Sequence, residues 1–120
     1  MYIGLLEDDL AIQEMLRFVL QDVGDAITIY PNAEACLKAL TASEQVPIDV
    51  LIVDWRLPGS MSGIEVIRRI RHNPRLSSLP IILTTAAMFP DTDELQHLHV
   101  RLLEKPFDID EMVRMMRSLE

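Results

Sequence analysis

The sequence predicts an α/β fold in which a doubly wound parallel sheet of five strands carries helices on both faces. Five short apolar runs alternate along the chain with segments whose apolar residues recur at helical spacing. This alternation favours parallel strands covered by helices. The 120 residues contain no internal repeat, no low-complexity tract and no linker, so we expect one domain over residues 1–120.

The five apolar runs have the length of strands and are rich in branched side chains. They are YIGLL (2–6), AITIY (26–30), DVLIV (49–53), PIILT (80–84) and VRLL (100–103).

Each helix is predicted from an apolar stripe and its end signals. The stripes run over residues 12–23, 33–40, 64–70 and 109–116. Asn32 is a good N-cap, Gly24 stands where a helix C-cap would lie, and the Asn-Pro pair at 73–74 stops the third helix. Cys36 falls on an apolar stripe, which indicates a buried packing residue. The weakest helix is the fourth, since Pro90 leaves only about two turns over residues 91–97.

Composition narrows the function classes. The chain is 49% hydrophobic and 25% charged, which is typical of a globular protein, and its apolar runs are too short to span a bilayer. Eleven basic and 19 acidic residues give a net charge of −8, which argues against this chain gripping a nucleic-acid backbone by itself. A single cysteine and an N-terminus without a secretory pattern favour the cytoplasm.

Polar residues follow the predicted strands at the edge where open parallel sheets bind ligands. Carboxylates that converge there would repel one another by roughly 4 kcal/mol per pair at about 4 Å and an effective dielectric near 20. A divalent cation such as Mg²⁺ (or Mn²⁺) and a lysine would neutralise them, and a central carboxylate could then attack phosphorus. The residues concerned are Glu7, Asp8 and Asp9 after the first strand, Asp54 after the third, Thr84 and Thr85 at the fourth, and Lys105 after the fifth.

Four motifs in this order, LLEDD, DVLIVDWRLPG, LPIILTTAA and EKPF, resemble the receiver domain of two-component response regulators over essentially the whole chain. The resemblance implies a flavodoxin-like sheet with strand order 2-1-3-4-5. It also implies that a sensor histidine kinase or phosphotransfer domain donates a phosphoryl group to Asp54. Such a domain catalyses only its own phosphorylation and dephosphorylation. It signals to an output domain or effector through a conformational or oligomerisation change.

The resemblance also assigns roles to single residues. The metal would be held by Glu7, Asp8, Asp54 and the backbone carbonyl of Arg56. Thr85 would be the switch hydroxyl, and Lys105 would contact the phosphoryl group. Asp9, one place beyond the acid pair, either caps the first helix or joins the metal site.

Three features depart from the family pattern. The loop at 58–63 is one residue longer than its commonest form, and the stretch from Thr85 to Lys105 is about two residues shorter. The aromatic switch position, three residues before Lys105, is Leu102. We therefore expect an activated state that differs from the common pattern, or a small population shift.

Three other readings compete. A haloacid dehalogenase-type hydrolase would need a second acid two residues after Asp54, where this chain has Arg56. A flavodoxin-type cofactor module would need a phosphate-binding loop where Glu7 to Asp9 would repel phosphate. A receiver-like interaction domain with an atypical or absent phosphorylation switch stays open because of Leu102. The kinase, the output and whether the chain forms a homodimer are also open.

Overall fold

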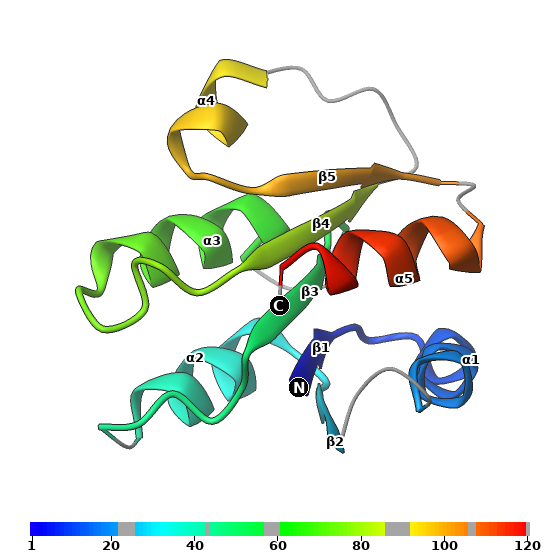
Figure 1. Cartoon of the computed structure of the whole chain (residues 1–120). Helices are drawn as coiled ribbons and strands as arrows, with labels where there is room; N and C mark the ends of the chain where they lie inside the picture. Colours follow the sequence, from blue (N-terminus) through cyan, green and yellow to red (C-terminus); the bar gives the residue numbers. More distant parts are fainter. Residues whose placement is uncertain (22–25, 43, 57–60, 86–91, 106–107, 120) are drawn as a thin grey trace.

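A five-stranded parallel sheet lies between two layers of helices (Figure 1). The computed structural model describes residues 1–21, 26–42, 44–56, 61–85, 92–105 and 108–119. The strand order β2-β1-β3-β4-β5 confirms the predicted fold class. The strands are β1 Tyr2–Leu6, β2 Ala26–Tyr30, β3 Val50–Asp54, β4 Ile81–Thr85 and β5 Arg101–Glu104, and the helices are α1 Leu10–Leu20, α2 Ala33–Thr41, α3 Gly63–His72, α4 Thr92–His97 and α5 Ile109–Arg117.

The last three strands each lie one residue further along the chain than the sequence predicted. At β3 the reason is Asp49, whose backbone N–H donates to the Tyr2 carbonyl at 2.7 Å and whose Oδ2 accepts from the Tyr2 N–H at 2.6 Å. Asp49 therefore ties down the start of β1 and does not begin the strand. At the other end, Asp54 is the last residue of β3 and lies opposite Thr84 in the ladder. The acid is thus fixed by the sheet itself.

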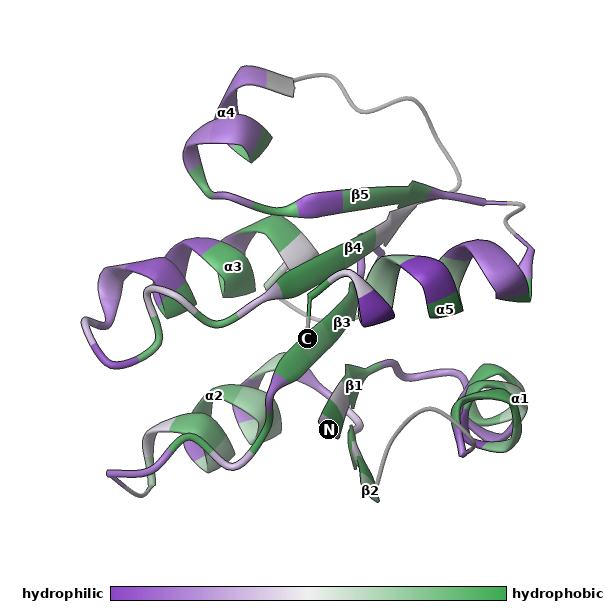
Figure 2. Ribbon diagram, in the orientation of Figure 1, coloured by the Kyte–Doolittle hydropathy of each residue, from purple (hydrophilic) through white to green (hydrophobic). Residues whose placement is uncertain are grey.

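Side chains alternate along the central strand and supply two separate cores. Val50 and Ile52 face α1 and α5, where they pack with residues such as Leu16 and Met112. Leu51 and Val53 face α2, α3 and α4. The hydropathy colouring in Figure 2 shows β1, β3 and β4 as mainly apolar and α4 as mainly polar. A strand buried on both faces is rigid enough to hold a reactive group at its end.

Side-chain caps begin four of the helices. The predicted cap Asn32 is confirmed, because its Oδ1 accepts from the Ala35 N–H at 2.8 Å. Asp9, Ser62 and Asp108 cap α1, α3 and α5. The expectations at Gly24 and Pro90 lie outside the described residues.

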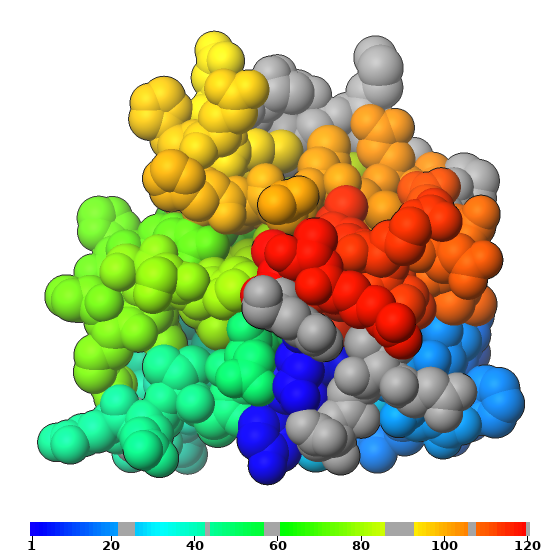
Figure 3. Space-filling view, viewed as in Figure 1, coloured from blue at the N-terminus to red at the C-terminus, as the bar shows by residue number. Residues whose placement is uncertain are grey.

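Helix α5 lies across one face of the molecule close to α1, as the space-filling view shows (Figure 3). The chain starts on the same face, beside the end of α5 (Figure 1). In the described part of the chain, no helix has the length and apolar character needed to cross a membrane.

Candidate functional site

The Asp54 carboxylate is held through both of its oxygens at the carboxyl end of the sheet. Lys105 Nζ lies 3.2 Å from Oδ2, and the Arg56 backbone N–H donates to Oδ1 at 3.1 Å. The backbone of Lys105 is fixed as well, because its N–H donates to the Thr85 carbonyl at 2.6 Å. The Asp54 side chain is 14% exposed and the Lys105 side chain is 30% exposed, so this ion pair is largely shielded from water. A shielded lysine neutralises a neighbouring charge more strongly than an exposed one.

Glu7 is a buried acid beside Asp54. It is only 2% exposed, and burial, followed by a hydrogen bond to Asp54 and the charge of Asp54, raises its pKa to about 8 from an ordinary 4.5. The charge of Lys105 acts in the opposite direction. Glu7 Oε2 has no hydrogen-bond partner among the described residues. A buried oxygen without a partner is costly, so this atom marks a place for a proton donor or a cation.

The other two acids of the first motif are exposed. The charge of Asp8 still acts on Glu7, where it adds to the rise in pKa. Asp9 caps α1, because its Oδ1 accepts from the backbone N–H groups of Ala11 and Ile12 at 2.9 and 3.1 Å. Within the described ranges, no three Asp, Glu, His or Cys side chains are gathered closely enough to hold a metal ion. Of the acids singled out in the sequence, the structure therefore brings Glu7 and Asp54 together.

The two threonines at the end of β4 occupy different places. Thr84 is opposite Asp54 in the ladder and lines a cavity beside it, and its Oγ1 lies 3.5 Å from the Val53 carbonyl. Thr85 is one residue further along and is 2% exposed. Leu102 is half-buried and packs against the core that faces α2, α3 and α4.

The cavity beside Asp54 has a volume of about 300 Å³ and opens between α1 and α5. Glu7, Asp54, Thr84 and Lys105 form its polar end, and the other lining residues are apolar. Met15 of α1 and Ile109 of α5 line it while remaining 49% and 42% exposed, so they form its outer rim. The cavity therefore has a polar end at Asp54 and an apolar rim that is partly exposed.

Two residues that hold the site in place were missed in the sequence. A Cβ on Gly63 would lie 2.5 Å from the Asp54 carbonyl oxygen, so only glycine lets the start of α3 approach β3 this closely. Gln13 of α1 is 8% exposed and donates from Nε2 to the Glu7 carbonyl at 2.6 Å. Gln13 could have been found from its spacing, because a polar residue at this position falls on the same helix face as the buried Leu16 and Leu20.

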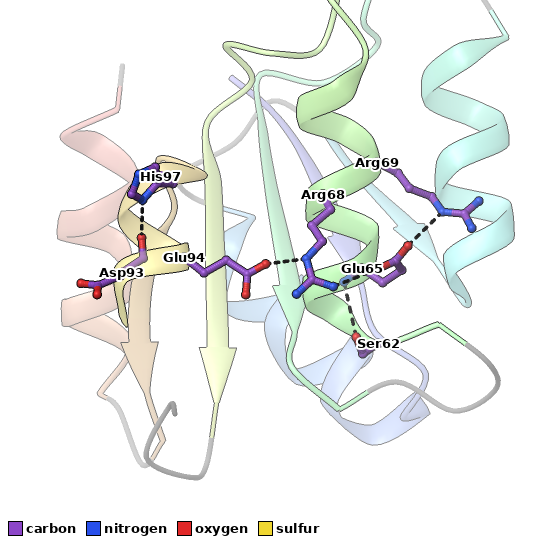
Figure 4. A network of polar contacts seen from close by, with 7 residues as sticks. All are labelled: Ser62, Glu65, Arg68, Arg69, Asp93, Glu94 and His97. Carbon is purple, nitrogen blue, oxygen red and sulfur yellow. Dashed lines mark hydrogen bonds and ion pairs between the residues drawn. The ribbon is translucent and has the colours of Figure 1, made fainter. Parts of the chain in front are cut away.

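A second polar network joins α3 to α4, away from the site (Figure 4). Arg68 of α3 donates to Glu94 of α4 at 2.5 Å and to Glu65 at 3.2 Å. Arg71 donates to the carbonyls of Leu98, Leu76 and His99 at 2.7, 3.2 and 3.3 Å, and burial lowers its pKa. These contacts attach α4 and the turn that follows it to α3.

His99 takes a backbone conformation that usually requires glycine. Its φ is 55°, in the left-handed region. The sequence has no glycine between α4 and β5, so His99 itself takes this conformation. Arg71 binds the His99 carbonyl and so helps to hold this turn.

The donor groups around Asp54 fit a hard divalent cation. They are the carboxylate oxygens of Glu7 and Asp54, a ligand type that Mg²⁺ prefers, and one of them, Glu7 Oε2, is buried without a partner in the described part of the chain. Burial and the neighbouring Asp54 raise the pKa of Glu7, so its ionised form lacks nearby positive charge that a cation could supply.

Comparison with known proteins places the chain in a family. Residues 3–117 match the family model of the response regulator receiver domain, so the chain belongs to that family. It is 42% identical over 85 residues, 70% of its length, to the phosphate regulon transcriptional regulatory protein PhoB of Rhizobium meliloti. It is 32% identical over 119 residues, 98% of its length, to the transcriptional regulatory protein FixJ of Bradyrhizobium diazoefficiens.

Solved structures agree with this assignment. The chain is 29% identical to the response regulator protein TrrA of Thermotoga maritima, crystallised in complex with Mg²⁺ and BeF, with a TM-score of 0.83 and coverage of 99% and 98% of the two chains. The chemotaxis protein CheY4 of Vibrio cholerae is 21% identical with a TM-score of 0.84, which shows the shared fold. The matched regions cover 35% of PhoB and 55% of FixJ, so the chain spans about half or less of these relatives. The protein is a receiver domain of the two-component signalling class.

Proposed function

We propose that Asp54 accepts a phosphoryl group from a sensor histidine kinase or phosphotransfer domain in a reaction that depends on Mg²⁺ or Mn²⁺. One observation carries the proposal: the Asp54 carboxylate ends a buried strand 3.2 Å from Lys105 Nζ, beside a buried Glu7 oxygen without a described partner. The likeness to TrrA, which was solved with Mg²⁺ and BeF, supports the same reading. These parts are suited to neutralising the charge of a phosphoryl transition state.

In the transfer, an oxygen of the Asp54 carboxylate forms a bond to phosphorus while the bond between phosphorus and the donor imidazole nitrogen breaks. The electron pair leaves with the imidazole, and Asp54 becomes an acyl phosphate. Lys105 then exchanges part of its contact with Asp54 for a phosphoryl oxygen.

Four groups are proposed to hold the cation: the carboxylates of Glu7, Asp8 and Asp54, and the Arg56 carbonyl. When bound, the cation supplies positive charge to the phosphoryl oxygens. Thr85 is proposed to donate its hydroxyl to the phosphoryl group, and Leu102 occupies the second switch position.

The proposed setting is the cytoplasm, with residues 1–120 acting as one domain whose phosphorylation is read by an output domain, an effector or a second copy of the chain. PhoB and FixJ, which are longer than this chain, are transcriptional regulators by name. The net charge of −8 supports signalling through such a partner, with no direct contact between this chain and nucleic acid. We propose no membrane contact.

A second candidate is a receiver-like interaction domain whose phosphorylation switch is atypical or absent. It is favoured by Leu102, which is half-buried and lacks the ring that would have to move. Phosphorylation itself separates the two candidates.

The test is incubation with acetyl phosphate and Mg²⁺ followed by intact mass measurement, on the wild type and on Asp54→Ala. We expect one phosphoryl group on the wild type, none on Asp54→Ala, and none on the wild type in excess chelator. An unmodified wild type would eliminate the leading proposal and favour the interaction domain. An adduct on Asp54→Ala would show that another residue is the acceptor.

A further inference from the structure

Gln13 is a polar side chain on the buried face of α1. It is 8% exposed, and the other buried residues of this helix are Leu16 and Leu20. A buried amide is costly unless it is hydrogen-bonded, and Gln13 Nε2 donates to the Glu7 carbonyl at 2.6 Å. A leucine at this position would fill the space as Leu16 and Leu20 do. What the amide adds is the hydrogen bond to the Glu7 carbonyl.

The bond acts on the peptide unit between the two acids of the proposed metal site. The Glu7 carbonyl and the Asp8 N–H belong to one planar peptide group, so fixing the carbonyl fixes the plane. The neighbouring groups are held separately: the Glu7 N–H donates to the Tyr30 carbonyl at 3.2 Å, and Asp9 caps α1. Gln13 thus holds the middle of a short segment whose two ends are fixed by β2 and by α1.

We infer that Gln13 is a positioning residue that sets the directions of the Glu7 and Asp8 carboxylates toward a divalent cation. This inference rests on the proposed function, because it assigns a task to Gln13 within that site. Without the bond, the peptide plane between the acids can rotate. Binding of the cation would then have to order the two carboxylates, and this cost lowers the affinity of the site for the cation.

The inference predicts a specific kinetic pattern. Gln13 does not touch the reacting atoms, so its loss should raise the Mg²⁺ concentration needed for half-maximal phosphorylation and leave the rate at saturating Mg²⁺ within about twofold of wild type. Partners one shell away from a metal typically change its affinity by about 10-fold or more. A residue that only stabilised the fold would not separate these two quantities.

The experiment uses the whole chain and the variant Gln13→Met, which keeps the length of the side chain and removes the donor. Mg²⁺ binding is measured by calorimetry and by the fluorescence of Trp55, the only tryptophan, which adjoins Asp54. Phosphorylation by acetyl phosphate is then timed across a range of Mg²⁺ concentrations. We expect the Mg²⁺ dissociation constant to rise by about 10-fold.

Arg71→Met is the matched control, since it also removes hydrogen bonds to backbone carbonyls, at the junction of α3 with the turn after α4. It should bind Mg²⁺ as the wild type does. If Gln13→Met does not fold, Gln13→Asn keeps an amide but withdraws it from Glu7, and the same loss of affinity is expected.

The outcomes are distinguishable. Wild-type affinity in a folded Gln13 variant overturns the inference, and so does an equal loss in Arg71→Met. A wild type that neither binds Mg²⁺ nor accepts a phosphoryl group overturns the proposed function, and the inference with it.

Discussion

The molecule contains two groups of charged residues that differ in how far they are removed from water. Around Asp54, the acid is 14% exposed, Glu7 is 2% exposed and one carboxylate oxygen has no partner among the described residues. Between α3 and α4, Arg68 is 45% exposed and pairs with Glu65 and Glu94, which are 39% and 28% exposed (Figure 4). Both groups consist of ordinary ion pairs and hydrogen bonds.

Burial makes the two groups suited to different tasks. Exposed ion pairs are screened by water and salt and contribute little to the free energy of unfolding. The main effect of the Arg68 network is therefore to orient α4. Near Asp54, shielding from water strengthens the interactions between charges, and one buried carboxylate oxygen has no partner among the described residues. A site that is incomplete in this way favours whatever completes it, here a cation and a phosphoryl group.

The largest expected effect comes from removing the lysine of the buried group. Lys105→Met should slow phosphorylation by acetyl phosphate on the order of 100-fold, because one positioned donor to the developing charge is lost. Intact mass measured over time gives the rate. Lys38→Met on the exposed side of α2 removes the same charge and should react as the wild type does. Equal rates for all three proteins would show that Lys105 does not act on the phosphoryl group.

The next effect tests the part of the α3–α4 junction that is shielded. Arg71→Met should lower the free energy of unfolding by about 1–3 kcal/mol, because three carbonyls lose a charged donor. Urea denaturation monitored by circular dichroism measures the change. A variant as stable as the wild type would mean that water replaces Arg71 at these carbonyls.

The third effect is a dependence of the folding stability on pH, which comes from Glu7. Because burial raises the pKa of Glu7 from 4.5 to about 8, the folded state binds more protons than the unfolded state between these values. The stability that this proton provides is complete below about pH 4.5 and is lost as the pH rises through 8.

Glu7→Gln removes this dependence. In chelator, the variant and the wild type should have similar stability at low pH, and by pH 9 the variant should be the more stable of the two. Denaturation at a series of pH values measures the difference. Parallel curves over the whole range would show that Glu7 does not hold this proton.

Much of the fold was predictable because the signals are local. Five apolar runs separated by helical stripes predict the parallel sheet and its helices, whereas the strand order was implied by the family resemblance. The strand ends were less predictable, since Asp49 leaves the ladder to bind Tyr2, a residue distant in sequence. No local sequence pattern predicts a contact between residues so far apart in the chain.

The sequence predicted that Asp54, Glu7 and Lys105 lie close together, but it did not predict how their side chains are held. The carboxyl edge of the sheet brings Asp54, Glu7 and Lys105 together, as strand ends must. The sequence left open whether Asp9 caps α1 or joins the metal site, and the structure shows the cap. Gln13 and Gly63 act through a side-chain contact and a steric limit, and both depend on tertiary packing that no motif encodes.

The smallest expected effect is at the exposed ion pair between Arg68 and Glu94. Glu94→Gln should leave the urea midpoint close to that of the wild type, because Arg68 keeps Glu65 as a partner and water screens both charges. Any difference should vanish in 1 M salt, where the Debye length is about 3 Å. A large, salt-resistant loss would mean that this pair behaves like the buried group at Asp54. The contrast between the two regions would then come from their chemistry and not from their exposure to water.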